Sequence, residues 1–155
     1  MKKTFVISLF VLIIDIISKQ LVSHFLAEGE SIVIISKFFS LTFAKNNGVA
    51  FSMLEGMSIF IVIVTIIVIC YIIKYILNDS HLFYEDIGYS FIIGGAIGNL
   101  IDRIVYGYVI DFLDFNIFGY DFPVFNIADS AIVIGVIIVI IVSFMKGDVR
   151  NEIDC

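Results

Sequence analysis

The chain has 155 residues, of which 61% are hydrophobic and 15% are charged, and its mean hydropathy is +1.11. This composition provides too little polar surface to cover a water-soluble globule, so it indicates a membrane protein. The net charge of −6, with no basic cluster in the sequence, argues against a nucleic-acid partner, because phosphate binding needs clustered lysine and arginine. Cys70, within an apolar run, and Cys155, at the very end, do not indicate a disulfide scaffold.

Four stretches are long and apolar enough to predict helices that cross a hydrocarbon core about 30 Å thick. They cover about residues 4–22, 57–77, 87–103 and 127–145, and the polar ends of the last two lie on the same side. The start of the chain also fits a cleavable secretory signal peptide, but Asp15 interrupts the apolar run and no small-residue cleavage site follows. We therefore predict one all-α membrane domain over residues 1–155, with four transmembrane helices.

Charged flanks predict that both termini lie in the cytoplasm. Basic residues gather at one set of helix ends, namely Lys2, Lys3, Lys74, Lys146 and Arg150, whereas Lys37 and Lys45 lie in the loop on the other side. The outer segments are then about residues 23–56 and 104–126. Within the first, SIVIIS and FFSLTFA mix β-branched and aromatic residues, which predicts strands at the outer membrane surface. A small extracytoplasmic β platform should therefore accompany the helices.

Polar residues within a span are costly, so each needs a reason. In the first span Asp15 and Lys19 are four residues apart, on one helix face, and they either neutralise each other or brace an active site. In the third span Gly94, Gly95 and Gly98 form a smooth patch, which favours close helix packing.

The outer end of the third span carries an amide, a carboxylate and a guanidinium. Asn99 stands three residues before Asp102 and four before Arg103, so the three side chains stack along the helix. A purely structural helix end does not need three such groups.

Two further aspartates follow at the same membrane level. Asp111 lies in VIDFLDF, and Asp129 lies in FNIADS at the mouth of the fourth span. Asp129 alone could simply interact with a helix dipole. If the two carboxyl groups approach closely, however, repulsion and desolvation raise one pKa, so that one acid and one base coexist near neutral pH. This is the arrangement of an aspartic protease, in which the protons belong to the pair.

Other catalytic chemistries fit less well. His24 and His81 are predicted on opposite sides of the membrane, and the sequence has no zinc-ligand spacing. It contains no HExxH, GxSxG, P-loop or GxGxxG motif. Ser18 and Lys19 are adjacent on a helix and therefore point apart, which weakens a serine–lysine dyad.

Five motifs in order resemble those of the bacterial lipoprotein signal peptidases (signal peptidase II), which are intramembrane aspartic peptidases. Each motif alone is a weak pattern, but all five between four spans are specific. Val49 and Ala50 replace the commoner Ala-Ala of the family, a small change at an apolar position. The motifs are Asp15 with Lys19, Asn46-Asn47-Gly48-Val49-Ala50-Phe51, residues 94–103 (GGAIGNLIDR), Val109-Ile110-Asp111-Phe112 and Phe125-Asn126-Ile127-Ala128-Asp129.

The resemblance implies that Asp111 and Asp129 are the catalytic pair. Its implied substrate is a prolipoprotein whose lipobox cysteine carries diacylglycerol, cleaved just before that cysteine near the outer leaflet of the bacterial cell membrane. The expected partners are this substrate and membrane lipid, with no metal, cofactor or nucleic acid, and a monomer is expected. The resemblance further implies substrate-binding roles for Asn46, Gly48, Asn99, Arg103 and Asn126, and supporting roles for Asp15, Lys19 and Asp102.

Two other functions remain open at this point. Buried Asp, Lys and Arg also form ion relays, so a proton-coupled transporter is the main alternative. A transporter would more naturally spread its ionisable residues through the membrane and show paired halves. A noncatalytic assembly factor packed through the glycine face would leave Asp111 and Asp129 without a purpose.

Overall fold

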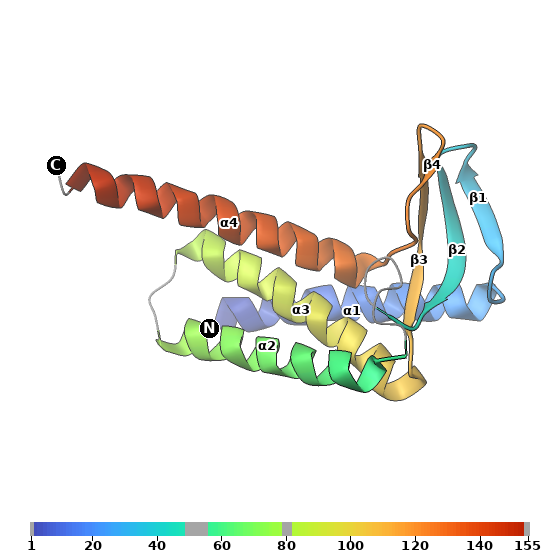
Figure 1. Ribbon diagram of the computed structural model, residues 1–155, viewed down its shortest axis with the longest axis horizontal. Helices are drawn as coiled ribbons and strands as arrows, with labels where there is room; N and C mark the ends of the chain where they lie inside the picture. The colour runs from blue at the N-terminus through green and yellow to red at the C-terminus, as the bar shows by residue number, and fades with distance from the viewer. Residues whose placement is uncertain (1, 49–55, 79–81, 154–155) are drawn as a thin grey trace.

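The structure is a computed structural model that describes residues 2–48, 56–78 and 82–153. Within these residues the chain is mostly helical, with a small antiparallel sheet at one end of the helices (Figure 1). Residues 49–51 of the predicted second motif, His81 and Cys155 lie outside the described residues. In chain order the elements are α1 (Lys2–Phe25), β1 (Ser31–Ile35), β2 (Phe39–Asn46), α2 (Ser58–Asn78), α3 (Phe83–Tyr106), β3 (Val109–Ile117), β4 (Tyr120–Asp121) and α4 (Ile127–Ile153).

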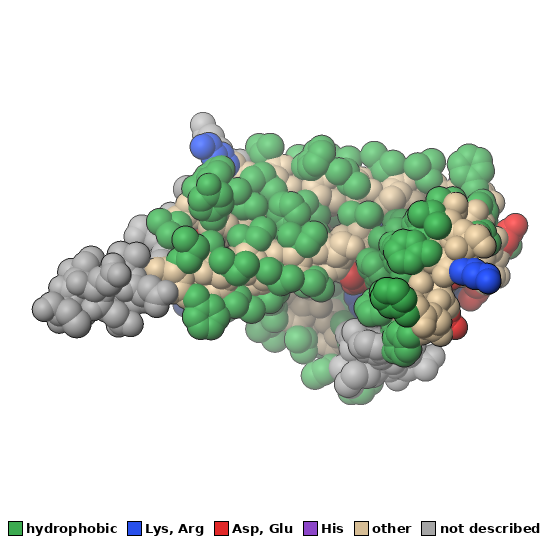
Figure 2. Space-filling model, turned by 90° about the horizontal axis from the view of Figure 1, so that it is seen from above, with side chains coloured by type: hydrophobic (Ala, Val, Ile, Leu, Met, Phe, Trp, Pro, Cys, Tyr) green, Lys and Arg blue, Asp and Glu red, His purple; other side chains and the backbone are tan. Residues whose placement is uncertain are grey.

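Three of the described helices, α1, α2 and α4, are long and apolar enough to cross a membrane. Hydrophobic side chains cover most of the helix surface seen in Figure 2, as expected for helices in contact with lipid. The prediction of four transmembrane helices is therefore supported for three. The 24-residue α3 is about 36 Å long, which is enough for a crossing. Its Gly, Ser and Asn residues lower its mean hydropathy, so its crossing stays a prediction.

Helices α1, α3 and α4 extend beyond the predicted spans. Helix α3 begins at Phe83, where the Glu85 carboxylate accepts the Leu82 N–H at 3.0 Å, and it ends at Gly107, whose left-handed φ of 83° stops the helix. At the other end of the chain, α4 continues to Ile153 rather than stopping near residue 145.

Close helix packing surrounds α3, which lies between α1, α2 and α4 (Figure 1). A side chain at Gly95 would overlap the Ala128 backbone of α4, and one at Gly98 would overlap the Asp15 carboxylate of α1. The packing role predicted for these glycines is confirmed. The absence of a Cβ at Gly98 also lets a charged side chain of α1 reach the face of α3 that carries Asn99 and Asp102.

The sheet is larger than the sequence predicted. The order β1-β2-β3-β4 is antiparallel throughout, and β3 with β4 lies within the second outer segment, about residues 104–126, in which the sequence predicted no strand. The start of β3 is buried on both faces, so it lacks the alternation that identifies a strand in a sequence. A small core fixes the sheet to the end of α1, and its buried residues are Val22, Leu26, Phe43, Ile110 and Phe112.

Candidate active site

The first turn of α4 holds one of the two predicted aspartates. Asn126 precedes the helix, and its side-chain oxygen accepts the Asp129 N–H at 2.9 Å. Asp129 returns the interaction, because its Oδ2 accepts the Asn126 N–H at 3.2 Å. This reciprocal arrangement is a capping box, which fixes the Asp129 carboxylate at the helix N-terminus.

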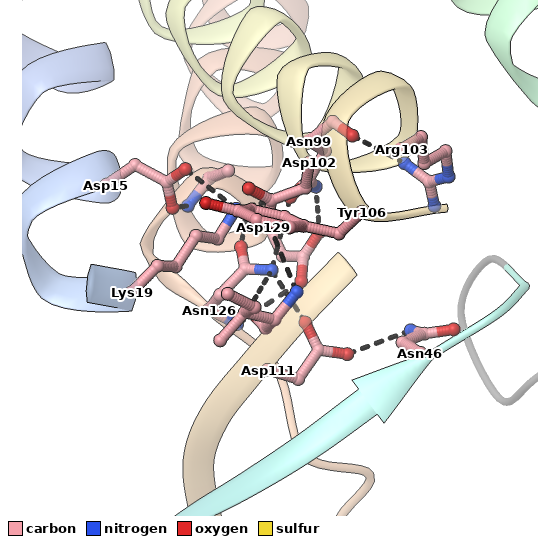
Figure 3. Close-up of polar contacts among 12 residues, drawn as sticks. Asp15, Lys19, Asn46, Asn99, Asp102, Arg103, Tyr106, Asp111, Asn126 and Asp129 are labelled. Carbon is pink, nitrogen blue, oxygen red and sulfur yellow. Dashed lines mark hydrogen bonds and ion pairs between the residues drawn. The ribbon is translucent and has the colours of Figure 1, made fainter. Parts of the chain in front are cut away.

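The Asn126 side chain connects this helix to the second predicted aspartate (Figure 3). Its Nδ2 donates to Asp111 Oδ1 on β3 at 2.6 Å. The other oxygen of Asp111 accepts from Asn46 Nδ2 on β2 at 2.8 Å. Asn126 and Asp111 are almost completely buried. The structure therefore brings Asp111 and Asp129 to the two sides of one asparagine.

A third asparagine binds Asp129 from α3. Asn99 Nδ2 donates to Asp129 Oδ1 at 2.7 Å. Asn99 Oδ1 in turn accepts from Lys19 Nζ at 2.9 Å and from Asn126 Nδ2 at 3.2 Å. Because two donors occupy the oxygen of this amide, its nitrogen must face Asp129.

Lys19 lies at the centre of a second buried cluster. Its Nζ is 2.7 Å from Asp15 Oδ2 and 3.0 Å from Asp102 Oδ2. Asp15 Oδ1 accepts the Ala128 N–H at the start of α4 at 2.9 Å, and Asp102 Oδ2 accepts the Ile110 N–H on β3 at 3.1 Å. The Asp15–Lys19 pair is therefore neutralised, and it also ties α1 to the elements that carry Asp111 and Asp129. A role of this pair in bracing an active site stays a prediction.

Arg103 joins α3 to the segment that follows β2. Its guanidinium donates to the Gly48 carbonyl oxygen at 2.7 Å and to the Asn99 carbonyl oxygen at 3.3 Å. Gly48 is also held locally, because its N–H donates to Asn46 Oδ1 at 2.9 Å. Arg103 and Gly48 thus border the site on the side of the sheet.

The environment of Asp111 favours its protonated form. Burial, followed by the negative charge of Asp129, raises the pKa of the Asp111 carboxyl to about 7, although the hydrogen bonds from Asn46 and Asn126 act in the opposite direction. A carboxyl group in this state can hold a proton at neutral pH, which is the property that acid–base catalysis requires.

All ten residues selected from the sequence lie in this connected site, but several links between them were not predicted. The capping of Ala128 by Asp15 and the placement of Asp111 within a strand are visible only in the fold. The Asn126–Asp129 link had a sequence signal, because their spacing of three residues is that of a capping box. Within the described part of the chain, no group of three His, Cys, Asp or Glu side chains could hold a metal ion.

The chain is similar to known proteins over most of its length. Residues 7–145 match a family model described as signal peptidase (SPase) II. A lipoprotein signal peptidase of Staphylococcus aureus (strain bovine RF122 / ET3-1) is 41% identical over 147 residues, which cover 94% of this chain and 90% of the relative. Another from Staphylococcus aureus is 41% identical over 149 residues, covering 96% and 90%.

Two solved structures of bacterial membrane enzymes, both obtained by the in meso method, have the same fold. One has a TM-score of 0.89 and 38% identity and covers 98% of this chain and 92% of its own; the other has a TM-score of 0.84 and 39% identity and covers 92% of each. The transporter alternative finds no support in these matches, and the long apolar helices indicate a multi-pass bacterial membrane protein. The chain therefore belongs to the signal peptidase II family, the peptidases that remove signal peptides from prolipoproteins.

Proposed function

We propose that this chain is an intramembrane aspartic endopeptidase that cleaves diacylglyceryl prolipoproteins just before the lipidated cysteine. The observation that carries the proposal is the position of Asn126 between Asp111 and Asp129, with each carboxylate oriented by a second asparagine from another element. Amide donors orient a carboxylate without neutralising it, so both groups keep their acid–base capacity.

In the proposed reaction the pair carries one proton. The ionised carboxylate takes a proton from water while the carboxylic acid gives its proton to the scissile carbonyl oxygen, and the water oxygen bonds to the carbonyl carbon. In the second half the peptide nitrogen takes the proton that came from water, the C–N bond breaks, and a hydroxyl of the intermediate returns a proton to the other carboxylate. The products are a carboxyl group on the signal peptide and a free amine on the lipidated cysteine. These steps use Asp111, Asp129 and one water molecule.

The remaining polar residues bind the substrate or support the pair. Arg103 is a donor for a substrate carbonyl. A guanidinium has five N–H groups, and the hydrogen bonds to the backbone oxygens of Gly48 and Asn99 leave N–H groups that can donate to the substrate. Asn46, Gly48 and Asn126 complete the substrate-binding side, while Asp15, Lys19 and Asp102 hold Asn99 and the start of α4 in place.

The whole chain acts as one peptidase domain, a monomer with four helices across the membrane and both termini in the cytoplasm. In this orientation the outer ends of α3 and α4 and the sheet lie at the outer leaflet. A substrate anchored by its acyl chains and signal helix then presents its scissile bond at the level of Asp111 and Asp129.

A cleavage assay with one prolipoprotein, with and without diacylglycerol on its cysteine, tests the proposal. Asp111→Asn should abolish cleavage of the lipidated substrate, whereas Asp114→Asn should retain it. Asp114 is a matched control, because it lies on the same strand and also accepts a hydrogen bond, from Thr42 at 2.6 Å. Full activity of purified Asp111→Asn would remove the pair from the reaction. Equal cleavage of the two wild-type substrates would contradict the proposed substrate class.

A further inference from the structure

Toward its tip, one face of the sheet is polar, whereas the base of this face packs on the end of α1. Along this face the Ser31 hydroxyl is 2.8 Å from the Thr42 hydroxyl, and Thr42 donates to Asp114 at 2.6 Å. Nearer the tip, Asn116 donates to its cross-strand partner Asp121. The strand register places the side chain of Val33 on this face too, since Val33 lies opposite Ser40 and Ser40 opposite Asp114.

The opposite face of the sheet is aromatic, and it is only partly covered. Alternate positions of β3 point to it, and Phe115 stacks on Phe39 with ring centroids 4.6 Å apart and on Phe125 at 5.7 Å. Phe122 meets Phe125 edge to face. Tyr120, which is paired with Ile117, continues the row and is exposed. We call this the aromatic face, made up of Phe39, Leu41, Leu113, Phe115, Ile117, Tyr120, Phe122 and Phe125.

The tip of the sheet is formed by two turns that project sideways beyond α4 (Figure 1). Phe118, in the turn between β3 and β4, is fully exposed, and Lys37 and Phe38 in the turn between β1 and β2 line the same hollow. Figure 2 looks down on this end and shows hydrophobic side chains on the side nearest the helices, with charged side chains on the far side. The aromatic face is therefore turned toward the space beside α4, where the helices contact lipid.

Water is a poor environment for such a face. Each phenylalanine or tyrosine would expose a large apolar ring to water. At the boundary between lipid chains and headgroups, by contrast, aromatic residues are stabilised. Phe118 also has a left-handed φ of 53°, a conformation that favours glycine or asparagine in such a turn. A lysine beside exposed aromatic rings is typical of a surface that meets phospholipid headgroups.

We propose that the aromatic face rests on the phospholipids of the outer leaflet beside α4, with Phe118 inserted among the acyl chains just below the headgroups. The inference rests on the proposed orientation of the helices, and not on the chemistry of the aspartates. Asp111 points to the same side of β3 as Leu113, Phe115 and Ile117, about 20 Å along the strand from Ile117 at about 3.3 Å per residue. Contact between this face and lipid therefore fixes the height of Asp111 relative to the leaflet that holds the substrate.

The chain contains no tryptophan, so one introduced tryptophan reports on its own surroundings. Full-length Phe118→Trp and the control Val33→Trp, which lies near the tip on the polar face, are reconstituted in vesicles of equal parts phosphatidylglycerol and phosphatidylcholine. We expect Phe118→Trp to emit at shorter wavelength than Val33→Trp and to be less quenched by aqueous iodide. Lipids brominated near the ester groups should quench it severalfold more than lipids brominated near the chain ends. Neither readout needs cleavage activity, so a failure of the proposed catalysis would leave this test intact.

Two results would overturn the proposal. Equal emission wavelengths and equal iodide quenching in the two variants would place the aromatic face in water. A short-wavelength emission that brominated lipids leave unquenched would assign the face to protein. In that case, if the emission of Phe118→Trp returned to longer wavelength when the protein was diluted with excess lipid, the aromatic face would be covered by a second copy of the chain.

Discussion

Two pairs of largely buried carboxylates lie at the same end of the helices, and they differ in what stands between their members. Asp15 and Asp102 share the ammonium group of Lys19, at 2.7 and 3.0 Å. Asp111 and Asp129 share an uncharged asparagine, Asn126. Within the residues that the structure describes, neither Asp111 nor Asp129 accepts a hydrogen bond from a lysine or an arginine. A cation offsets part of the negative charge of the first pair, whereas amides only orient the second.

In the proposed reaction, this difference separates structural carboxylates from reactive ones. A cation between two buried carboxylates offsets the cost of removing their charges from water, so that cluster holds helices together. Amide donors leave the charge in place, so burial and mutual repulsion can raise a pKa, as they do for Asp111. We therefore expect the Lys19 cluster to support the fold, and the pair on either side of Asn126 to carry the proton chemistry of the proposed reaction.

The largest effect should follow from removing one member of the reactive pair. Asp129→Asn keeps the size of the side chain and an oxygen that can accept from Asn99, so the fold should remain. Turnover of a diacylglyceryl prolipoprotein should fall by about 10²- to 10⁴-fold or more, the usual contribution of an acid–base group. Loss of the negative charge should also lower the pKa of Asp111, which carbon NMR of its carboxyl group can measure. Asp121→Asn, on the exposed tip of the sheet, serves as the control and should match the wild type.

Removing the cation from the other pair should instead destabilise the fold. Lys19→Met leaves Asp15 and Asp102 buried without compensation, which should lower the free energy of unfolding by about 3–5 kcal/mol. Thermal unfolding in detergent measures this loss. The control is Lys45→Met, because Lys45 pairs with the exposed Glu28 at 2.7 Å and its loss should leave the melting temperature unchanged. Similar melting temperatures for both variants would show that Lys19 is dispensable for folding.

Arg103 provides an intermediate case, since it is charged but bonds to backbone oxygens. Arg103→Ala should raise KM by about 10- to 100-fold, the equivalent of one charge-assisted hydrogen bond, with a smaller change in kcat. Arg103→Lys should recover only part of this loss, because a lysine lacks the planar fork. Substrate titrations in mixed micelles distinguish these outcomes, and an unchanged KM would exclude Arg103 from substrate binding.

The smallest effect concerns pH. The raised pKa keeps a proton on the Asp111–Asp129 pair below about pH 7, and this proton is lost as the pH rises through that value. Because the reaction needs one proton on the pair, kcat/KM should fall above about pH 7, approaching tenfold per pH unit. Asp114→Asn should show the same profile as the wild type, since Asp114 lies outside the pair. A profile that stays flat up to about pH 9 would contradict the shared-proton reaction.

Much of the helical fold could be predicted from the sequence, because long apolar runs have few ways to avoid water other than crossing a membrane. The third predicted span is the exception, because α3 carries the glycines that admit its neighbours and the polar groups of the site. These residues leave α3 without the long apolar stretch that marks the other three described helices as candidate spans. The function of α3 therefore weakens the sequence signal that would identify it.

The sheet was predicted only in part, and the reason is local. β1 and β2 alternate or mix aromatic and β-branched residues in short runs, whereas β3 is buried on both faces where it begins. Asp111 therefore looked like a loop residue, although the strand is what presents it to Asn126. The aromatic face is visible only once the register pairs Phe39 with Phe115.

The sequence by itself determined which residues form the site, because a polar side chain in an apolar run is costly and stands out wherever it lies. It also determined, through five ordered motifs, the family to which the chain belongs. Only the tertiary structure decided how the carboxylates are divided, since Asp15 with Asp102 and Asp111 with Asp129 come from four different elements. Whether a buried carboxylate meets the ammonium of Lys19 or the amide of Asn126 depends on contacts between residues far apart in the chain, and those contacts determine which pair keeps its proton chemistry.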